Sequence, residues 1–339
     1  MTALPSVRLV ALTTALGLGV ALFAAASPPA ALADDGGIAW SVQTADNSHG
    51  SGRANFAYTA DPGAVISDTM IVVNTGTEPL PLTVYAADAF TAASGEIDVL
   101  ADGTPSADAG TWVSVGQTSA ELAPGQSADV PFTITVPTDA RPGDHSAGIV
   151  TSLTSREASS SLSVERRLGT RINLRVAGDL APAAAVTGVT ARYEGSWNPF
   201  ESGRLVVEYS LENTGNTRLT GVDTLTIDGL VPAATTPAQL PEIVTGSAVR
   251  VTREFSAFSI GWLAGRVEIT PEGVGLGADA VAPIVADFGV AAPPWSLYAL
   301  VLVVMAAVVA ALLIVRRRAA RRVRESAVDP AQYDGAQAV

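Results

Sequence analysis

Apolar and polar residues alternate with a period of two along much of the chain between residues 34 and 294. The clearest case is 130–136, where four apolar residues are separated by Pro131, Thr133 and Thr135. Such alternation buries one face of a strand and leaves the other in water, as in antiparallel sheets. No helical period stands out in this region, so the pattern predicts an all-β fold. The same alternation recurs at 80–84, 205–211 and 266–270.

A second regularity is the tripeptide Asn-Thr-Gly, which occurs twice. It lies at 74–76, within VVNTGTEPLPLTV, and at 213–215, within LENTGNTRLTGVDTL. Glycine reaches positive φ at low cost and asparagine caps turns with its side chain, so we predict hairpin turns of three to five residues. The repeat predicts two related β-sandwiches, the first with a polar loop inserted at 93–112. Coincidence is the alternative, because Asn-Gly turns are common in β proteins.

Segments of small residues and proline indicate the domain boundaries. The first sandwich is expected at 34–178, a linker at 179–185 and the second sandwich at 186–290. A short second linker then leads to a long apolar run.

The first 33 residues are typical of a secretory signal peptide. Arg8 is the only charge before the apolar run 9–26, and Ala31-Leu32-Ala33 offers the small-x-small pattern of a cleavage site. An uncleaved N-terminal membrane anchor is the alternative.

Residues 295–315 form the second apolar run, 21 residues without a charge. A helix of that length spans about 31 Å, which matches a hydrocarbon core of roughly 30 Å. Trp295 and Tyr298 suit an aromatic belt, and the arginines at 316–324 mark the cytoplasmic side. We therefore predict a cell-membrane protein with one transmembrane helix, an extracellular N-terminus and a cytoplasmic basic tail at 316–339. A nucleic-acid role for these arginines is the weaker alternative.

The predicted exported part, residues 34–294, is strongly acidic. It holds 30 of the 33 acidic residues and 13 of the 20 basic ones, a net charge of −17. Such a charge excludes a nucleic-acid-binding module. The chain has no cysteine, and two domains of roughly 130 residues are large enough to rely on their cores instead of disulfides.

Few side chains suit catalysis or metal binding. The two histidines are His49 and His145, and the neighbours Asp144 and Ser146 would point away from His145 on a strand or turn. We expect His145 to be a turn or surface residue. This geometry gives no catalytic residue, and we predict that the protein is not an enzyme. Zinc needs three or four ligands, which two histidines and no cysteine do not supply. We therefore predict no metal and no cofactor. A loose calcium site within 98–108 is the alternative to a solvated acidic loop.

One cluster of charge suits ligand binding. Arg166, Arg167, Arg171 and Arg175 fall within ten residues, and the alternation at 171–176 predicts that Arg171 and Arg175 face outward. Guanidinium groups bind carboxylates and phosphates with two parallel bonds. We predict contact with peptidoglycan or another wall polymer here. The alternative is a solvated strand face paired with neighbouring acidic residues.

A second candidate surface is the aromatic loop EGSWNPF at 194–200. Trp197 and Phe200 lie beside glycine and proline, and loop aromatics often anchor a protein partner. We predict partner contact there, with packing against a sandwich end as the alternative.

Several turn and core signatures of the first domain follow one another in a recognisable order. They include Asp61-Pro62-Gly63, Ile71-Val72-Val73-Asn74, Tyr85-Ala86-Ala87-Asp88, Leu122-Ala123-Pro124-Gly125, Val136-Pro137, Pro142-Gly143-Asp144-His145 and Arg167-Leu168-Gly169-Thr170-Arg171-Ile172. In these segments the chain resembles the WxL-interacting proteins of Gram-positive bacteria. The resemblance implies two Ig-like domains in tandem before one membrane helix, with a first domain that binds peptidoglycan. It also implies a second domain that meets a surface protein, with a WxL-domain protein as a neighbour.

Together these features predict a non-enzymatic, membrane-anchored surface protein that binds the cell wall and scaffolds a protein partner. The alternative is an adhesion or surface-assembly subunit that acts through protein contacts, such as strand pairing at a sheet edge, without wall binding. An accessory module for a separate enzyme is a third possibility.

Overall fold

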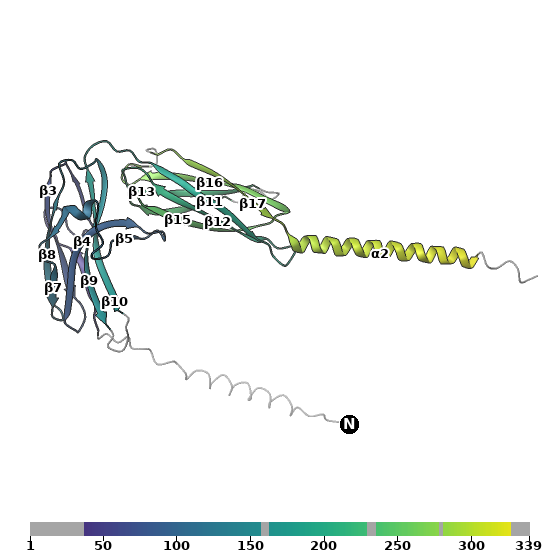
Figure 1. The fold of residues 1–339 in the computed structure, drawn as a ribbon, viewed down its shortest axis with the longest axis horizontal. Coiled ribbons are helices and arrows are strands. Elements are labelled where there is room, and N and C mark those ends of the chain that lie inside the picture. Colours follow the sequence, from purple (N-terminus) through teal and green to yellow (C-terminus); the bar gives the residue numbers. More distant parts are fainter. Residues whose placement is uncertain (1–36, 157–162, 229–234, 278–280, 327–339) are drawn as a thin grey trace, which may run out of the picture.

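The computed structural model describes residues 37–156, 163–228, 235–277 and 281–326 (Figure 1). The predicted signal peptide lies outside the described residues. The all-β prediction is confirmed, because two β-sandwiches precede a single C-terminal helix.

The first sandwich packs a four-stranded sheet on a six-stranded one. The first sheet has the order β1 (Trp40–Thr44), β3 (Val65–Asn74), β8 (Ser127–Thr135) and β6 (Val113–Val115). The second has the order β2 (Phe56–Ala60), β10 (Ser163–Val176), β9 (Gly143–Arg156), β4 (Leu80–Thr91) and β5 (Ile97–Val99), with β7 (Ser119–Leu122) also paired to β4. The β2–β10 pair is parallel and the other pairs are antiparallel.

The alternating residues build this core as the sequence predicts. On β8, Val130, Phe132 and Ile134 are buried. They pack in one cluster with Ile172 and Leu174 from β10 of the opposite sheet. Each such side chain that leaves water contributes about 1.5–3 kcal/mol, so the two inner faces hold the sheets together.

The second sandwich packs a three-stranded sheet on a four-stranded one. The sheet orders are β11 (Ala184–Glu194), β12 (Gly203–Asn213) and β15 (Ala248–Ala257), and then β14 (Thr235–Ile243), β13 (Leu219–Asp228), β16 (Gly261–Gly273) and β17 (Ile284–Ala292). Two antiparallel sheets of three and four strands with connections that cross between them are typical of Ig-like domains. Tyr209 lies fully buried in this core and donates a 2.7 Å hydrogen bond to Asp223.

The two Asn-Thr-Gly segments make the same hydrogen bonds in both domains. The Asn74 side chain donates to the carbonyl oxygens of Glu78 and Leu122 at 2.8 and 3.0 Å. Asn213 donates to those of Thr217 and Ile243 at 2.7 and 2.9 Å. In each case the asparagine Oδ1 accepts from the amide of the following glycine.

The hairpin prediction for these segments is wrong. β3 and β4 belong to different sheets, as do β12 and β13, so each Asn-Thr-Gly segment carries the chain across the sandwich. The glycines also serve a different purpose, since neither has a positive φ. A Cβ on Gly76 would overlap the backbone of Gly37, and one on Gly215 would overlap the backbone of Ala183.

The predicted polar insertion at 93–112 is partly regular structure. It contains β5 and the short 3₁₀ helix η1 (Ala109–Trp112). The β4–β5 connection reaches the second domain, where the Ala93 carbonyl accepts a 3.1 Å bond from the Arg250 amide.

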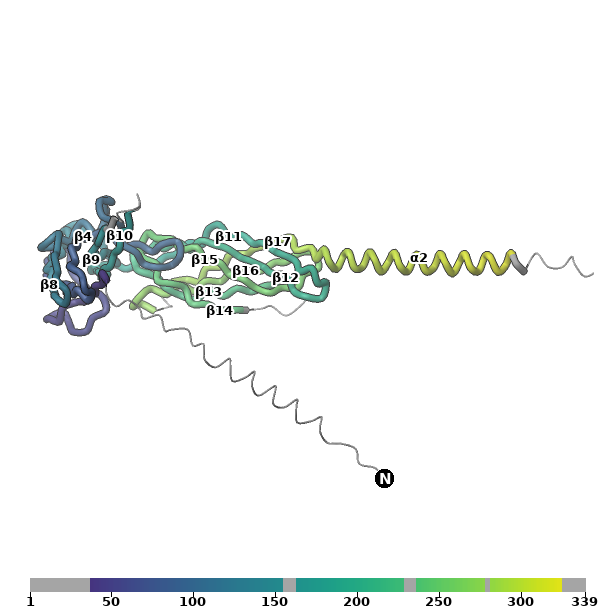
Figure 2. The backbone as a smooth tube through the Cα atoms, turned by 90° about the horizontal axis from the view of Figure 1, so that it is seen from below, coloured from purple at the N-terminus to yellow at the C-terminus, as the bar shows by residue number. Residues whose placement is uncertain are grey.

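The two domains meet at a seam and form an L (Figure 1), which Figure 2 shows from below with the first domain across the end of the second. Thr91 at the end of β4 bonds to Ser247, Glu242 and Val244 of the second domain at 2.9–3.1 Å. The Asp144 amide donates to the Asn216 carbonyl at 2.7 Å. β10 ends at Val176 and β11 begins at Ala184, so the predicted linker residues lie beside this seam.

The helix α2 (Trp295–Ser326) continues the long axis of the second domain (Figure 1). It is longer than the predicted span because the arginine-rich segment after Val315 is helical too. By length and composition this helix can cross a membrane.

Candidate functional site

The outward face of β10 carries three of the four predicted arginines. Arg167, Arg171 and Arg175 lie on one face of the strand, and Arg171 and Arg175 alternate with core residues. β2 runs alongside in parallel register, with Asn173 opposite Ala57. Arg166 does not join this row: its guanidinium donates at 3.4 Å to the Ile38 carbonyl. The structure thus brings together three of the predicted residues and separates the fourth.

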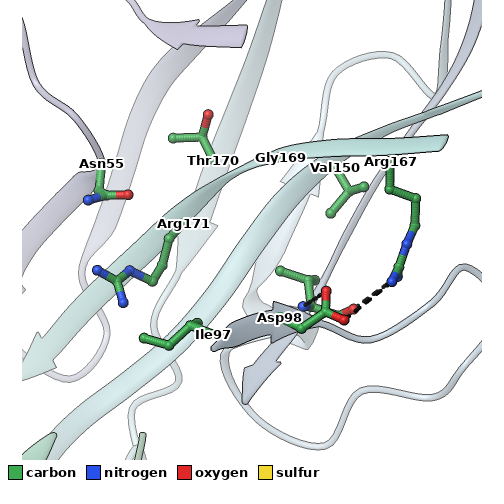
Figure 3. Close-up of a pocket in the computed structure, with 9 residues that line it drawn as sticks. Asn55, Ile97, Asp98, Val150, Arg167, Gly169, Thr170 and Arg171 are labelled. Carbon is green, nitrogen blue, oxygen red and sulfur yellow. Dashed lines mark hydrogen bonds and ion pairs between the residues drawn. The ribbon is translucent and has the colours of Figure 1, made fainter. Parts of the chain in front are cut away.

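Arg167 and Arg171 line one hollow of about 330 Å³ in this face. Figure 3 shows the two guanidiniums on either side of it, with residues of β5 between them. Residues of β5 form one wall, residues of β9 and β10 form the floor, and Asn55, just before β2, lies at the edge. The lining is mixed, with apolar and polar side chains side by side: Asn55, Ile97, Asp98, Val99, Val150, Arg167, Gly169, Thr170 and Arg171.

Long ion pairs hold both guanidiniums of this hollow. Arg167 lies 3.4 Å from Asp98, and Arg171 lies 3.3 Å from Glu242 of the second domain. The neighbouring Tyr85 hydroxyl and the charge of Asp98 raise the pKa of Arg167. Each arginine has five N–H donors and keeps its charge, so both can bind a further acceptor that enters the hollow.

Arg175 is bound much more tightly, at the seam. It makes two parallel bonds of 2.7 and 2.8 Å to Asp144, whose side chain is only 2% exposed. This hydrogen bonding raises the pKa of Arg175. The Arg218 amide donates at 2.8 Å to the same carboxylate, and the Arg218 guanidinium bonds Glu242 at 2.8 Å.

A second hollow, of about 260 Å³, lies beside this seam cluster. Arg175, Arg218 and Asp144 line it together with Tyr58 and Asn173. The Oδ1 of Asn173 is buried and has no hydrogen-bond partner among the described residues. The two hollows follow one another along the same face of β10, but the arginines of the second already bind Asp144 and Glu242.

His145 is not the exposed residue that the sequence suggested. Its side chain is 13% exposed, and its Nδ1 lies 2.7 Å from Asp108. Its Nε2 lies 2.9 Å from the Arg141 carbonyl, and its ring packs against Trp112. Burial alone would lower the pKa of His145, but the bonds to Asp108 and Arg141 outweigh it and raise the pKa above 6.5. Both ring nitrogens face acceptors, so this histidine does not present a base to a nucleophile.

Two acidic residues of the 98–108 loop are engaged by protein groups. Asp98 contacts Arg167 and Asp108 contacts His145. Within the described ranges, no three His, Cys, Asp or Glu side chains are close enough together to hold a metal ion.

Trp197 and Phe200 lie at the opposite end of the second domain, beside the start of α2. Their side chains are 97% and 80% exposed. The loop therefore does not fold back onto the sandwich end. Ser196 is tied to the helix, because its carbonyl accepts a 2.8 Å bond from Ser296.

Sequence reasoning missed Arg218 and Glu242, which complete the seam cluster. Each lies in ordinary alternating sequence, and they meet Asp144 and Arg171 only because the domains pack together. The Asp144–Arg175 pair could have been found from the sequence only by predicting the register of β9 against β10, because the two residues are cross-strand neighbours.

Comparisons with known proteins give structural neighbours and no relatives by sequence. No known protein-family profile matches the chain, and no curated protein matches it. The class 5 fimbriae chaperone CfaA is 10% identical, with a TM-score of 0.33, over 73% of this chain and 98% of that one. The CsuC–CsuE chaperone–tip adhesion subunit complex from Csu pili of Acinetobacter baumannii is 10% identical, with a TM-score of 0.34, over 74% and 97%. The Pseudomonas aeruginosa CupB2 chaperone is 11% identical, with a TM-score of 0.28, over 69% and 96%. Scores this low carry no argument about function.

Proposed function

We propose that this chain is a non-catalytic, membrane-anchored surface protein that binds another protein in the inner corner of its L. In this proposal the signal peptide directs export, α2 spans the cell membrane, and the arginine-rich end of α2 faces the cytoplasm. Both sandwiches then lie outside the cell, as the charge distribution favours.

One observation carries this proposal: the arginine-lined hollow opens into the inner corner of the L. The sheet that contains β9 and β10 lies on the side of the first domain that faces α2, whereas β3 and β8 lie on the far side (Figure 1). Glu242 and Val274 of the second domain contact Arg171 and Arg175 on this face. A ligand in the hollow therefore lies between the first domain and the membrane, where it also meets the second domain.

The lining favours a protein segment with a carboxylate. Ile97 and Val150 offer apolar contact, while Arg167 and Arg171 offer charged donors in an otherwise acidic protein. An acidic side chain flanked by apolar ones matches this mixture, because a few polar groups in a partly apolar site fix orientation. No aromatic ring lines the hollow among the described residues, so it lacks the flat apolar face against which a sugar ring would pack.

Crosslinking in cells tests this proposal, and the absence of native cysteine allows single-cysteine probes. Asn55→Cys places a probe in the hollow, and Ala54→Cys places one on an exposed neighbour outside its lining. We expect a discrete protein adduct with the Asn55→Cys chain and none with the Ala54→Cys chain. Equal labelling at both positions, or no protein adduct at either, would contradict the proposal.

A wall polymer is the second candidate, because the resemblance to WxL-interacting proteins implies peptidoglycan binding and two arginines share one hollow. Sedimentation of the full-length chain with purified sacculi tests it. Arg167→Gln with Arg171→Gln should abolish pelleting if the polymer binds here. Arg192→Gln with Arg266→Gln, on two exposed arginines of the second domain, is the charge-matched control. No pelleting by the parent chain would exclude wall binding.

A further inference from the structure

Large apolar side chains gather at the end of the second domain where α2 begins. Trp197 and Phe200 come from the β11–β12 loop, and Ile260, which is 54% exposed, comes from the β15–β16 loop. Single exposed apolar residues are ordinary on a protein surface. A group from two loops at one end, next to Trp295, indicates a surface that contacts something apolar.

Hydrogen bonds fix both loops to the first turn of α2. The Ser296 hydroxyl donates to the Ser196 carbonyl at 2.8 Å, and the Tyr298 hydroxyl donates to the Ile260 carbonyl at 2.7 Å. The depth of the loop side chains relative to the helix is therefore set. The charge-free part of the helix begins at Trp295 and is about as long as a hydrocarbon core is thick, so this first turn lies at the membrane interface.

The Trp197 loop is held in its exposed conformation by its own polar groups. The Asn198 amide donates to the Ser196 hydroxyl, and the Phe200 amide donates to the Asn198 side chain, both at 3.1 Å. Because the loop is already ordered, a contact made by Trp197 and Phe200 loses little further conformational entropy.

We propose that Trp197, Phe200 and Ile260, here called the juxtamembrane rim, insert into the headgroup region of the lipid bilayer. Tryptophan and other amphipathic rings prefer this region. The rim contacts the bilayer and not a protein because α2 enters the bilayer from the same end of the second domain. The second domain then rests on the membrane at the helix and at two loops, which holds its long axis upright.

Tryptophan fluorescence of the full-length chain in lipid nanodiscs tests this proposal. The emission of Trp197 is the difference between the parent chain and Trp197→Phe, a variant that keeps an apolar ring at that position. Trp112, in the first domain far from α2, is isolated in the same way with Trp112→Phe and serves as the control. We expect lipids brominated near the headgroup to quench the Trp197 emission at least two-fold more than the Trp112 emission.

A second quencher, which acts from water, tests the opposite location of the Trp197 ring. A Trp197 emission that resists brominated lipid but is quenched by aqueous iodide would place the ring in water and overturn the proposal. Trp197 packs against almost nothing, so Trp197→Phe does not disturb the fold. Trp112 packs against His145, so the melting temperature of Trp112→Phe is measured to show that this variant is folded. The result is independent of whether a protein binds the arginine-lined hollow.

Discussion

The substitution Asp144→Asn should lower the stability of the protein and weaken the energetic coupling between its two domains. The carboxylate of Asp144 is 2% exposed; it binds the guanidinium of Arg175 on the neighbouring strand and, across the seam, the amide of Arg218. The asparagine keeps one acceptor but removes the charge that two arginines face. Arg175, at 23% exposed, would then be mostly buried without its counter-charge, whereas Arg218 would keep its ion pair with Glu242.

Breaking a buried pair by removing one partner costs about 3–5 kcal/mol. The remaining solvent exposure of Arg175 and the acceptor kept by asparagine favour the lower end, about 3 kcal/mol. For domains of this size, 1 kcal/mol shifts the melting temperature by about 2–4 °C, so we expect a fall of about 6–12 °C. Because the substitution destabilises the first domain and also weakens the bond from Asp144 to Arg218 that joins the domains, one cooperative transition should become two.

Calorimetry of the full-length chain in detergent measures both effects. Asp287→Asn is the matched control, since Asp287 is 79% exposed and lies 3.8 Å from Arg266. Exposed pairs contribute about 0–1 kcal/mol, so the control should melt within about 4 °C of the parent. A single transition at the parent temperature in Asp144→Asn would show that the seam does not couple the domains.

Three further predictions concern stability. Burial alone would raise the pKa of Asp68, but hydrogen bonds from Arg53, Tyr58 and Asn47 lower it to about 2. The resulting stability, about 2 kcal/mol, is therefore present above pH 4 and lost as pH falls toward 2; acid titration of Asp68→Asn should show no such loss. The pKa of His145 is raised above 6.5, so its contribution is full below pH 6.5 and declines as pH rises through the raised value. His145→Gln should remove that alkaline decline in urea titrations. Asn74→Ala and Asn213→Ala each remove the asparagine donor from two backbone carbonyls, so each should cost roughly 1–3 kcal/mol in denaturant unfolding; unequal costs would show that the two networks are not equivalent.

The alternation of apolar residues revealed the strands because burial of one face is a local property of the sequence. Strand pairing is not local, and the Asn-Thr-Gly segments show this. Their residues indicate that the chain turns, and both asparagines do satisfy backbone carbonyls around that turn. Whether the next strand pairs with the previous one depends on β8 and β15, which occupy that neighbouring position from far along the chain.

The same limit applies to the arginine row. Alternation in β10 placed Arg171 and Arg175 outward, as the structure has them. The pattern did not distinguish the two arginines. In the structure Asp144 neutralises Arg175, whereas a longer ion pair to Glu242 holds Arg171. That difference arises from the register of β9 and from the packing of the second domain. Neither can be predicted from the alternation within β10 alone.

The seam and the proposed function are linked through the shape of the inner corner. The second domain is about 40 Å long, as judged from the 13 residues of β16 at about 3.3 Å each. A compact domain of 100 residues has a radius of gyration of about 13 Å, so one such domain fits between the arginine-lined hollow and the bilayer. This fit exists only while the first domain is held across the end of the second.

Asp144→Asn should therefore weaken partner binding without touching the hollow. We expect the protein adduct at Asn55→Cys to fall several-fold in the Asp144→Asn background, at a temperature where both domains remain folded. Asp287→Asn should leave the adduct unchanged, because it does not touch the seam. An adduct of equal yield in both backgrounds would mean that the partner contacts the first domain alone. The corner would then not be the docking geometry.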